Sequence, residues 1–275
     1  MSAPSALAAL RGAVMLAGAG KMGGALLEGW LKAGLSASQV AVRDPGPPPE
    51  IAALLSAHNI PLNADPEGDV AALILAVKPQ VAPDVLPQLS RFAGANSVVI
   101  SVMAGRTISF LEKSFPASAV IRTIPNTPAA IGRGITVAVP NRRADEKARA
   151  LTDALLRSTG PVEWIEDEDL MDAATAVSGS GPAYVFLLAE TLARAGEKAG
   201  LPAALAARLA RETISGAGEL LYRSDLPAAK LRENVTSPNG TTAAALKILM
   251  GEGGFEKLLE EAVAAATKRG KELAG

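Results

Sequence analysis

Residues 13–23, Ala-Val-Met-Leu-Ala-Gly-Ala-Gly-Lys-Met-Gly, place a glycine-rich turn directly after a short apolar run. The run Ala13–Ala17 predicts a buried strand, and the residues after the turn predict a helix. Gly18 permits the tight turn, Gly20 lets the backbone approach a pyrophosphate, and Gly23 lets the helix pack closely on the strand. The stretch therefore predicts the first strand, turn and helix of a dinucleotide-binding domain.

The first half of the chain alternates such apolar runs with segments of helical periodicity. Helices are expected between the runs, for example over Lys21–Ala33, Pro49–Ala57 and Val81–Phe92. The alternation predicts an α/β domain with a doubly wound, mostly parallel sheet of Rossmann type over residues 1–165. The runs rich in Val, Ile, Leu or Ala, typical of strands buried on both faces, are Ala13–Ala17, Val40–Val42, Leu73–Val77, Val98–Ser101, Val120–Arg122 and Ile135–Val139.

The pattern changes near Glu163–Asp167, after which runs typical of strands disappear. Residues 166–275 are therefore expected to form an all-α domain whose helices are separated by Gly and Pro. Apolar residues lie on more than one face of these helices, more than a small domain can bury, which predicts a homodimer through this domain. The expected helices are Asp172–Val177, Pro182–Ala199, Pro202–Tyr222, Ala228–Asn234, Thr242–Met250 and Phe255–Leu273.

Composition excludes several classes of function. The net charge of −1 offers no basic field for nucleic acid or anionic membranes. The absence of cysteine excludes disulfides and thiolate catalysis, and the single histidine, His58, expected on a helix surface, cannot build a His-rich metal site. The segment Met1–Leu10 does not resemble a signal peptide, and no apolar run is long enough to span a membrane. We expect a cytoplasmic protein without a metal centre.

A second informative stretch, Leu-Arg-Glu-Asn-Val-Thr-Ser-Pro-Asn-Gly-Thr-Thr at residues 231–242, interrupts the helical half and restarts a helix. The first N–H groups of a helix have no intrahelical partner and can hold a carboxylate, while a neighbouring hydroxyl orients a second polar group. A capped helix without a ligand is the alternative. Together with the dinucleotide pattern, this stretch favours a reductase that acts on a small acid.

The expected second strand ends at Arg43-Asp44, two residues with opposite preferences for a dinucleotide. An acid at this place binds the ribose hydroxyls of NADH, whereas an arginine pairs with the 2′-phosphate of NADPH. A solvated pair at the strand end is the alternative. The sequence leaves the choice between NADPH and NADH open.

From Ala13 to Leu273 the chain resembles the Δ1-pyrroline-5-carboxylate reductase family, enzymes that reduce a cyclic imino acid to proline. The first two of its markers are shared with other reductases, whereas the last two, in this order within an all-α domain, are specific. The markers are Gly18–Gly23, Ala76-Val77-Lys78-Pro79, Pro125-Asn126-Thr127-Pro128, Ser178-Gly179-Ser180-Gly181-Pro182-Ala183-Tyr184 and Asn234–Thr242.

The resemblance implies binding of NADPH or NADH by residues of both domains. Lys78 is expected to position the cofactor rather than to transfer protons. Asn63 is expected to contact the adenosine half, and the alternative is an asparagine that only forms a turn. Together with the residues discussed above, the implied cofactor contacts are Ala17, Gly18, Ala19, Gly20, Lys21, Met22, Gly23, Arg43, Asp44, Asn63, Ala76, Val77, Lys78, Pro79, Val102, Met103, Ala104 and Asn234.

For the imino-acid substrate, the resemblance implies binding by Gly240, Thr241, Thr242 and Glu168. Backbone N–H groups would bind the carboxylate, and the Thr242 hydroxyl, the expected catalytic group, would lie near the ring nitrogen. For Glu168 the alternative is a solvated acidic linker, Glu166–Asp169. The resemblance further implies that homodimers build larger rings, up to a decamer.

Three features of this sequence lie in or next to the family markers. Ser178–Pro182 is expected to form a packed turn that starts the helix containing Tyr184. Asn239 stands where the family usually has glycine, and because asparagine tolerates left-handed backbone best among the other residues, we expect the turn to survive. Ile124 replaces a more usual methionine.

The expected chemistry agrees with the scarcity of acid–base residues. A protonated imine is already electrophilic, so hydride transfer mainly needs proximity, orientation and carboxylate binding. One alternative is a reductase of the β-hydroxyacid dehydrogenase type, but Lys198 falls too late on its helix to be that class's proton donor. The other is a non-catalytic nucleotide-sensing or scaffold protein with the same fold.

Overall fold

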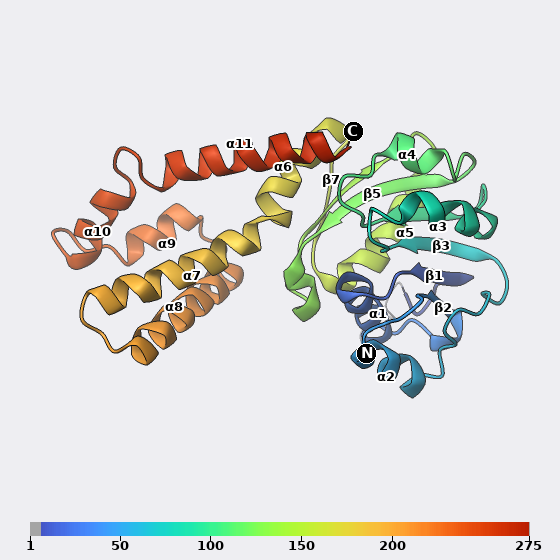
Figure 1. Cartoon of the computed structure of the whole chain (residues 1–275), viewed down its shortest axis with the longest axis horizontal. Helices are drawn as coiled ribbons and strands as arrows, with labels where there is room; N and C mark the ends of the chain where they lie inside the picture. Colours follow the sequence, from blue (N-terminus) through green and yellow to red (C-terminus); the bar gives the residue numbers. More distant parts are fainter. Residues whose placement is uncertain (1–6, 275) are drawn as a thin grey trace. The chain divides into compact units, whose positions relative to one another are not determined.

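The computed structural model describes residues 7–274, which form two compact units (Figure 1). Residues 7–179 and 267–274 form the first, called here the sheet unit, and residues 180–266 form the second, the helical unit. The prediction that Met1–Leu10 is not a signal peptide concerns mostly residues before Leu7, which lie outside the described residues.

The sheet unit contains a seven-stranded sheet with the order β2-β1-β3-β4-β5-β6-β7. Neighbouring strands are parallel except β5 and β6, which are antiparallel. The predicted doubly wound, mostly parallel sheet is therefore confirmed. The strands are β1 (Ala13–Ala17), β2 (Val40–Arg43), β3 (Val70–Leu75), β4 (Val98–Ser101), β5 (Ala119–Pro125), β6 (Thr136–Pro140) and β7 (Val162–Trp164).

Helices cover both faces of this sheet, as alternating β1 side chains require. Val14 and Leu16 pack in one apolar cluster with side chains of α1 (Lys21–Lys32), α2 (Pro49–Ala57) and α5 (Glu146–Leu156). On the other face, Met15 and Ala17 pack with side chains of α3 (Ala82–Leu89) and α4 (Ile108–Glu112).

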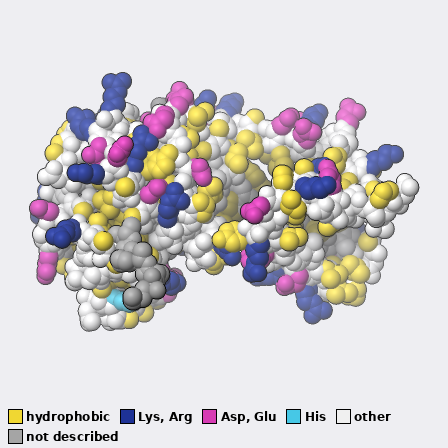
Figure 2. Space-filling view, turned by 180° about the vertical axis from the view of Figure 1, so that it is seen from behind, with side chains coloured by type: hydrophobic (Ala, Val, Ile, Leu, Met, Phe, Trp, Pro, Cys, Tyr) yellow, Lys and Arg dark blue, Asp and Glu magenta, His cyan; other side chains and the backbone are white. Residues whose placement is uncertain are grey.

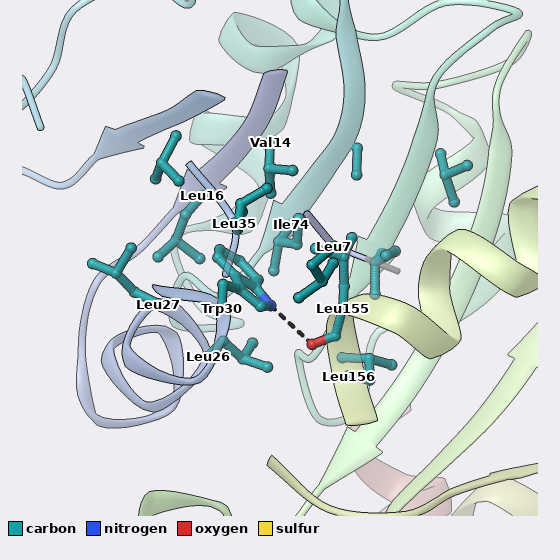
Figure 3. Close-up of a cluster of buried hydrophobic side chains, with 14 of the residues drawn as sticks. Leu7, Val14, Leu16, Leu26, Leu27, Trp30, Leu35, Ile74, Leu155 and Leu156 are labelled. Atoms are coloured by element: carbon teal, nitrogen blue, oxygen red, sulfur yellow. Dashed lines mark hydrogen bonds between the residues drawn. The ribbon is translucent and has the colours of Figure 1, made fainter. Parts of the chain in front are cut away.

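Trp30 of α1 lies at the centre of the first cluster (Figure 3). Its side chain is fully buried, and its indole Nε1 donates a hydrogen bond to the carbonyl of Leu155 at 2.9 Å. Burial of an aromatic ring whose single polar atom is paired adds apolar contact without an unsatisfied donor. This contact joins α1, the helix that follows the glycine turn, to α5.

Some element boundaries differ from the prediction. The third strand was placed at Leu73–Val77 but ends at Leu75, because the chain turns into a loop at Ala76. The segment predicted as one helix over Val81–Phe92 consists of α3 and a short 3₁₀ turn, Ser90–Phe92. Strand β7 was not predicted, since three residues with an exposed glutamate in the middle carry no apolar run.

Between β7 and residue 274, where the described part of the chain ends, the regular elements are all helical, and most lie close to the predicted bounds. The α-helices are α6 (Met171–Ala174), α7 (Gly181–Lys198), α8 (Ala203–Arg223), α9 (Ala228–Asn234), α10 (Thr241–Leu249) and α11 (Phe255–Ala274). The sequence division at 165/166 marks the end of the strands, whereas the compact units divide at Ser180. The two divisions differ because the first helical residues after 165 pack on the sheet. Met171, for example, is fully buried against Ile124 of β5 and Val139 of β6.

Within a single chain the helical unit buries little of its apolar surface. Helix α7 has no buried residue, and Phe186 and Ile248 are 67% and 75% exposed. Figure 2 shows apolar side chains spread over the surface of these helices. Exposed apolar surface of this extent is typical of a protein–protein interface. No helix in the described part of the chain is both long and apolar enough to cross a membrane.

Candidate cofactor and substrate sites

The glycine turn has the geometry that its spacing predicts. Gly18 has a φ of +92°, and a Cβ there would lie 2.5 Å from the carbonyl oxygen of Ala76. A Cβ on Gly23 would collide with the carbonyl oxygen of Gly18. At Gly20, the N-cap of α1, a Cβ would meet nothing within 4 Å. Two glycines are thus required by backbone packing, while the middle one faces open space in which a ligand can approach.

A cavity of about 340 Å³ lies beside this turn. It is lined by Gly20, Lys21 and Met22 from the start of α1, by Ile51 of α2, and by Thr127 and Ala130 after β5. Two acidic residues, Glu28 and Glu50, also line it. The N–H groups at a helix start and the ammonium of Lys21 both favour a negatively charged group. The part of the cavity at the start of α1 therefore suits an anionic group such as a pyrophosphate.

Asp44 is held against the glycine turn. Its Oδ2 accepts a hydrogen bond from the backbone N–H of Ala19 at 2.7 Å, and its Oδ1 accepts one from Gly46 N–H at 2.8 Å. Asn63, at a left-handed φ of +62°, binds the backbone N–H and carbonyl of Asp44, both at 2.9 Å. The Asn63 amide thus positions Asp44, whereas its contact with the adenosine half of a cofactor stays a prediction.

Arg43 points to different partners. Its guanidinium forms an ion pair with Asp65, whose same carboxylate oxygen also accepts from Arg91 at 3.1 Å. Both guanidiniums lie over the ring of Phe92, at 4.9 Å for Arg43 and 4.4 Å for Arg91. Neither Arg43 nor Asp44 is a freely solvated side chain. No pattern in the sequence indicated that Asp65 and Arg91 contribute to this cluster.

The loops after β3 and β4 complete this edge of the sheet. Ala76 N–H donates a hydrogen bond to the carbonyl of Ala17, and Val102 N–H donates one to the carbonyl of Leu75. These bonds hold the start of the first loop against the end of β1 and the start of the second loop against the end of β3. Lys78 is exposed, whereas the side chain of Met103 is buried in the core. Any contact of Met103 with a cofactor therefore falls to its backbone. The expected cofactor residues of the sheet unit all lie at the carboxyl ends of β1 to β4, where such folds bind ligands.

Glu168 is bound within the sheet unit. Its Oε1 accepts hydrogen bonds from Arg122 Nη1 at 2.8 Å and from the N–H of Ile108 at 2.9 Å. Arg122, on β5, is 3% exposed and also lies 3.8 Å from Asp172. The solvated-linker interpretation is therefore wrong for Glu168. Its contact with substrate stays a prediction.

The linker interpretation does describe Glu166. Its carboxylate is exposed and accepts hydrogen bonds from both Nη atoms of Arg149, which hold the pKa of Glu166 below its usual value. The sequence contains an indication that Glu168 has a buried partner. Arg122 follows the apolar residues Val120 and Ile121 in a predicted strand. A buried arginine requires an acidic partner, and acids four residues apart, as at 168 and 172, share one helical face.

The segment Ser178–Pro182 starts the helix that contains Tyr184, as predicted, but its first two residues belong to a π-helical turn. Residues Thr175–Gly179 form a π-helical turn, and α7 begins at Gly181, so the chain stays nearly helical throughout. Asn126, from the Pro-Asn-Thr-Pro marker, donates to the carbonyl of Ser178 at 3.1 Å and accepts from Ile135 N–H. The marker thus has a structural role, because Asn126 satisfies the carbonyl of Ser178.

In the helical unit, the stretch expected to bind the imino acid forms a turn before α10. Asn239 has a φ of +57°, which confirms the expected left-handed conformation. Gly240 is the N-cap, and no side chain among the described residues caps this helix. The first intrahelical bond is Ala244 N–H to Gly240 O, so the N–H groups of Thr241 and Thr242 precede it. These groups suit a carboxylate.

The remaining site expectations fall on exposed positions. Asn234 is the last residue of α9 and is exposed. His58 is exposed immediately after α2 rather than within the helix. Across residues 7–274, no group of three or more His, Asp or Glu side chains is arranged to hold a metal ion.

Comparison with protein families gives two matches, one for each half of the chain. Residues 168–273 match the model described as pyrroline-5-carboxylate reductase dimerisation. Residues 13–105 match the model described as NADP oxidoreductase, coenzyme F420-dependent. The second match contains the glycine turn, Asp44 and the loops after β3 and β4.

Similar proteins extend over nearly the whole chain. The pyrroline-5-carboxylate reductase of Pseudomonas aeruginosa is 38% identical and covers 94% of this chain and 95% of its own. That of Synechocystis is 45% identical over 73% of this chain and 74% of its own. Among solved structures, a pyrroline-5-carboxylate reductase from Coxiella burnetii has a TM-score of 0.88 at 30% identity, covering 96% of this chain and 99% of that one. The NADP-bound enzyme of Plasmodium falciparum has a TM-score of 0.77 at 28% identity, covering 96% and 98%.

Proposed function

The chain belongs to the pyrroline-5-carboxylate reductase family, and from this premise we propose that it reduces 1-pyrroline-5-carboxylate to L-proline with NADPH or NADH. This reaction is the last step of proline biosynthesis. The observation that carries the proposal is the similarity to named reductases over 94% of the chain, together with a glycine turn that leaves room for a dinucleotide.

The cofactor supplies the hydride when it is bound, and the sheet unit supplies its binding site. The N–H groups at the start of α1 and the ammonium of Lys21 bind the pyrophosphate. Asp44, which the N–H of Ala19 holds in place, is proposed to accept hydrogen bonds from the ribose hydroxyls. The loops Ala76–Pro79 and Val102–Ala104 contact the ribose and nicotinamide end. Asn234 is proposed as a further cofactor contact.

The turn before α10 supplies the binding site for the imino acid. The N–H groups of Thr241 and Thr242, unpaired within the helix, bind its carboxylate. The Thr242 hydroxyl accepts a hydrogen bond from the protonated ring nitrogen and orients the imine carbon. Glu168 is proposed to lie near the substrate through the position that Arg122 gives its carboxylate.

The proposal is tested by following NADPH and NADH oxidation with purified protein and 1-pyrroline-5-carboxylate. We expect turnover that depends on the imino acid and forms proline. Tight binding of either cofactor without turnover would support the scaffold alternative. Turnover of a β-hydroxyacid in place of the imino acid would support the other reductase class.

The helical unit is proposed to form a homodimer, and dimers are proposed to assemble further, up to a decamer. The match to a dimerisation model and the exposed apolar side chains of α7, α8 and α11 support the dimer. We expect light scattering at micromolar concentration to show a dimer or a multiple of it. A monomer under these conditions would contradict the assembly.

Arg43 is expected to discriminate between the two cofactors. Arg43 is the last residue of β2 and precedes Asp44, the proposed ribose-binding residue. We propose that its guanidinium exchanges its ion pair with Asp65 for one with the 2′-phosphate of NADPH. We expect Arg43→Ala to raise the KM for NADPH about three- to tenfold, which is the effect of losing a partly exposed ion pair. The KM for NADH should change little. Arg91→Ala is the control, because Arg91 shares Asp65 and Phe92 but is not among the expected cofactor contacts. Equal effects of Arg43→Ala on both cofactors would show that Arg43 does not reach the phosphate.

A further inference from the structure

Arg106 links the two loops that follow β3 and β4. It lies just after the Val102–Ala104 loop, yet its Nε donates a hydrogen bond to the carbonyl oxygen of Pro79 at 3.0 Å, and its Nη2 donates to the same oxygen. The side chain is partly buried. One guanidinium thus binds the end of the Ala76–Pro79 loop from the neighbouring strand's loop.

The guanidinium is itself held in place on its own side. It lies over the ring of Phe110, 4.6 Å from the ring centroid. Phe110 belongs to α4, whose N-cap Thr107 accepts a hydrogen bond from Phe110 N–H at 3.2 Å. A cation over an aromatic face gains electrostatic energy and loses rotational freedom. The donor that reaches Pro79 is therefore oriented before any ligand binds.

Pro79 is the residue at which such a contact matters most. A proline has no N–H, so its carbonyl is the one backbone group through which a hydrogen bond can hold it. The preceding residue, Lys78, uses its carbonyl in a turn with Val81 N–H. The contact from Arg106 therefore fixes the position of the Lys78-Pro79 segment relative to the loop after β4.

We propose that Arg106 is a positioning residue for the cofactor: it holds the Lys78-Pro79 segment and the Val102–Ala104 loop at a fixed separation. The inference rests on the proposed function for the identity of the ligand as NADPH or NADH. Hydrogen bonds from a charged donor are stronger than neutral ones, so a single arginine suffices for this task. Without it, the Lys78-Pro79 segment would lose this contact and would have to be ordered by the cofactor, at a cost in affinity.

The test compares Arg106→Leu and Arg106→Lys with wild type, measuring NADPH dissociation constants by fluorescence titration, steady-state KM and kcat, and melting temperature. Arg149→Leu is a matched control, because Arg149 also donates twice to one group and stacks on a ring, Trp164 at 5.2 Å, without touching a cofactor loop. We expect Arg106→Leu to weaken NADPH binding about tenfold, because it removes the charge-assisted hydrogen bonds to the Pro79 carbonyl. The KM for the imino acid should stay within about twofold of wild type.

Arg106→Lys, which keeps one donor, should recover part of the affinity, and Arg149→Leu should bind NADPH as wild type does. Unchanged NADPH binding in Arg106→Leu would overturn the inference. So would weaker binding accompanied by a fall in melting temperature clearly larger than that of Arg149→Leu, since this indicates a general structural role. Because binding is measured directly, wild type that binds NADPH but does not reduce the imino acid would refute the proposed reaction and leave the role of Arg106 standing.

Discussion

Gly18→Ala is expected to abolish cofactor binding. The φ of +92° at this position is strained for any residue with a Cβ, and that Cβ would lie 2.5 Å from the carbonyl oxygen of Ala76 and 2.7 Å from Val77 N. Because these atoms are backbone, the clash cannot be relieved by a side-chain rotation. The glycine turn and the Ala76–Pro79 loop must then separate, which moves two of the segments that hold the dinucleotide.

For this variant we expect NADPH affinity to fall by about a hundredfold or more, a loss of about 3 kcal/mol or more, together with a lower melting temperature. Fluorescence titration and thermal unfolding measure the two effects. Gly20→Ala separates them, because its Cβ meets no atom within 4 Å. It should melt as wild type does and still bind NADPH about tenfold more weakly, since the methyl group occupies space next to the pyrophosphate.

Gly94→Ala serves as the matched control, because a Cβ there also meets nothing within 4 Å and the residue precedes β4, at the edge of the sheet opposite the glycine turn. It should change neither measurement. If Gly18→Ala bound NADPH normally, the turn would not be the cofactor site. If Gly20→Ala did so, the pyrophosphate would have to lie elsewhere along α1.

The parallel part of the fold could be predicted from the sequence because its strands are buried on both faces. Such strands read as continuous apolar runs, and β1 and β4 coincide with their predictions. Most failures occur where this condition is absent, although the bounds of β3, a buried strand, also differ from the prediction. Strand β7 has an exposed Glu163 at its centre, and its pairing with β6 depends on a partner distant in the chain. The π-helical turn before α7 depends equally on tertiary contacts, including that between Asn126 and Ser178.

The candidate site divides in the same way. Its backbone part was predictable, since the glycine spacing and the left-handed Asn239 follow from local conformational rules. The side-chain contacts were not. Arg43 pairs with Asp65 and Arg106 binds Pro79, in both cases across a gap in sequence that no local pattern encodes. The loops of parallel strands meet in space although they are separated by whole helices, so their side-chain contacts appear only in the folded chain.

The structure sharpens the expected role of Thr242. At the start of a helix, a threonine hydroxyl can cap the helix or bind a ligand, and the two roles predict different damage on substitution. Gly240 is the N-cap of α10, and no side chain within residues 7–274 caps this helix. Thr242 lies at the second helical position and is partly buried. Its hydroxyl is therefore not committed to the cap, and little helix stability depends on it.

Thr242→Val keeps the shape of the side chain and removes the hydroxyl. A lost hydrogen bond to a charged imine costs about 1.5–3 kcal/mol in the transition state, so we expect kcat/KM for the imino acid to fall about ten- to hundredfold. The melting temperature should change little. Thr241→Val is the matched control, because Thr241 is exposed and only its backbone N–H is expected to bind the carboxylate, so its effect should be milder. A Thr242→Val enzyme with wild-type activity would show that the hydroxyl does not contact the imine, and the substrate would then depend on the backbone N–H groups of α10 alone.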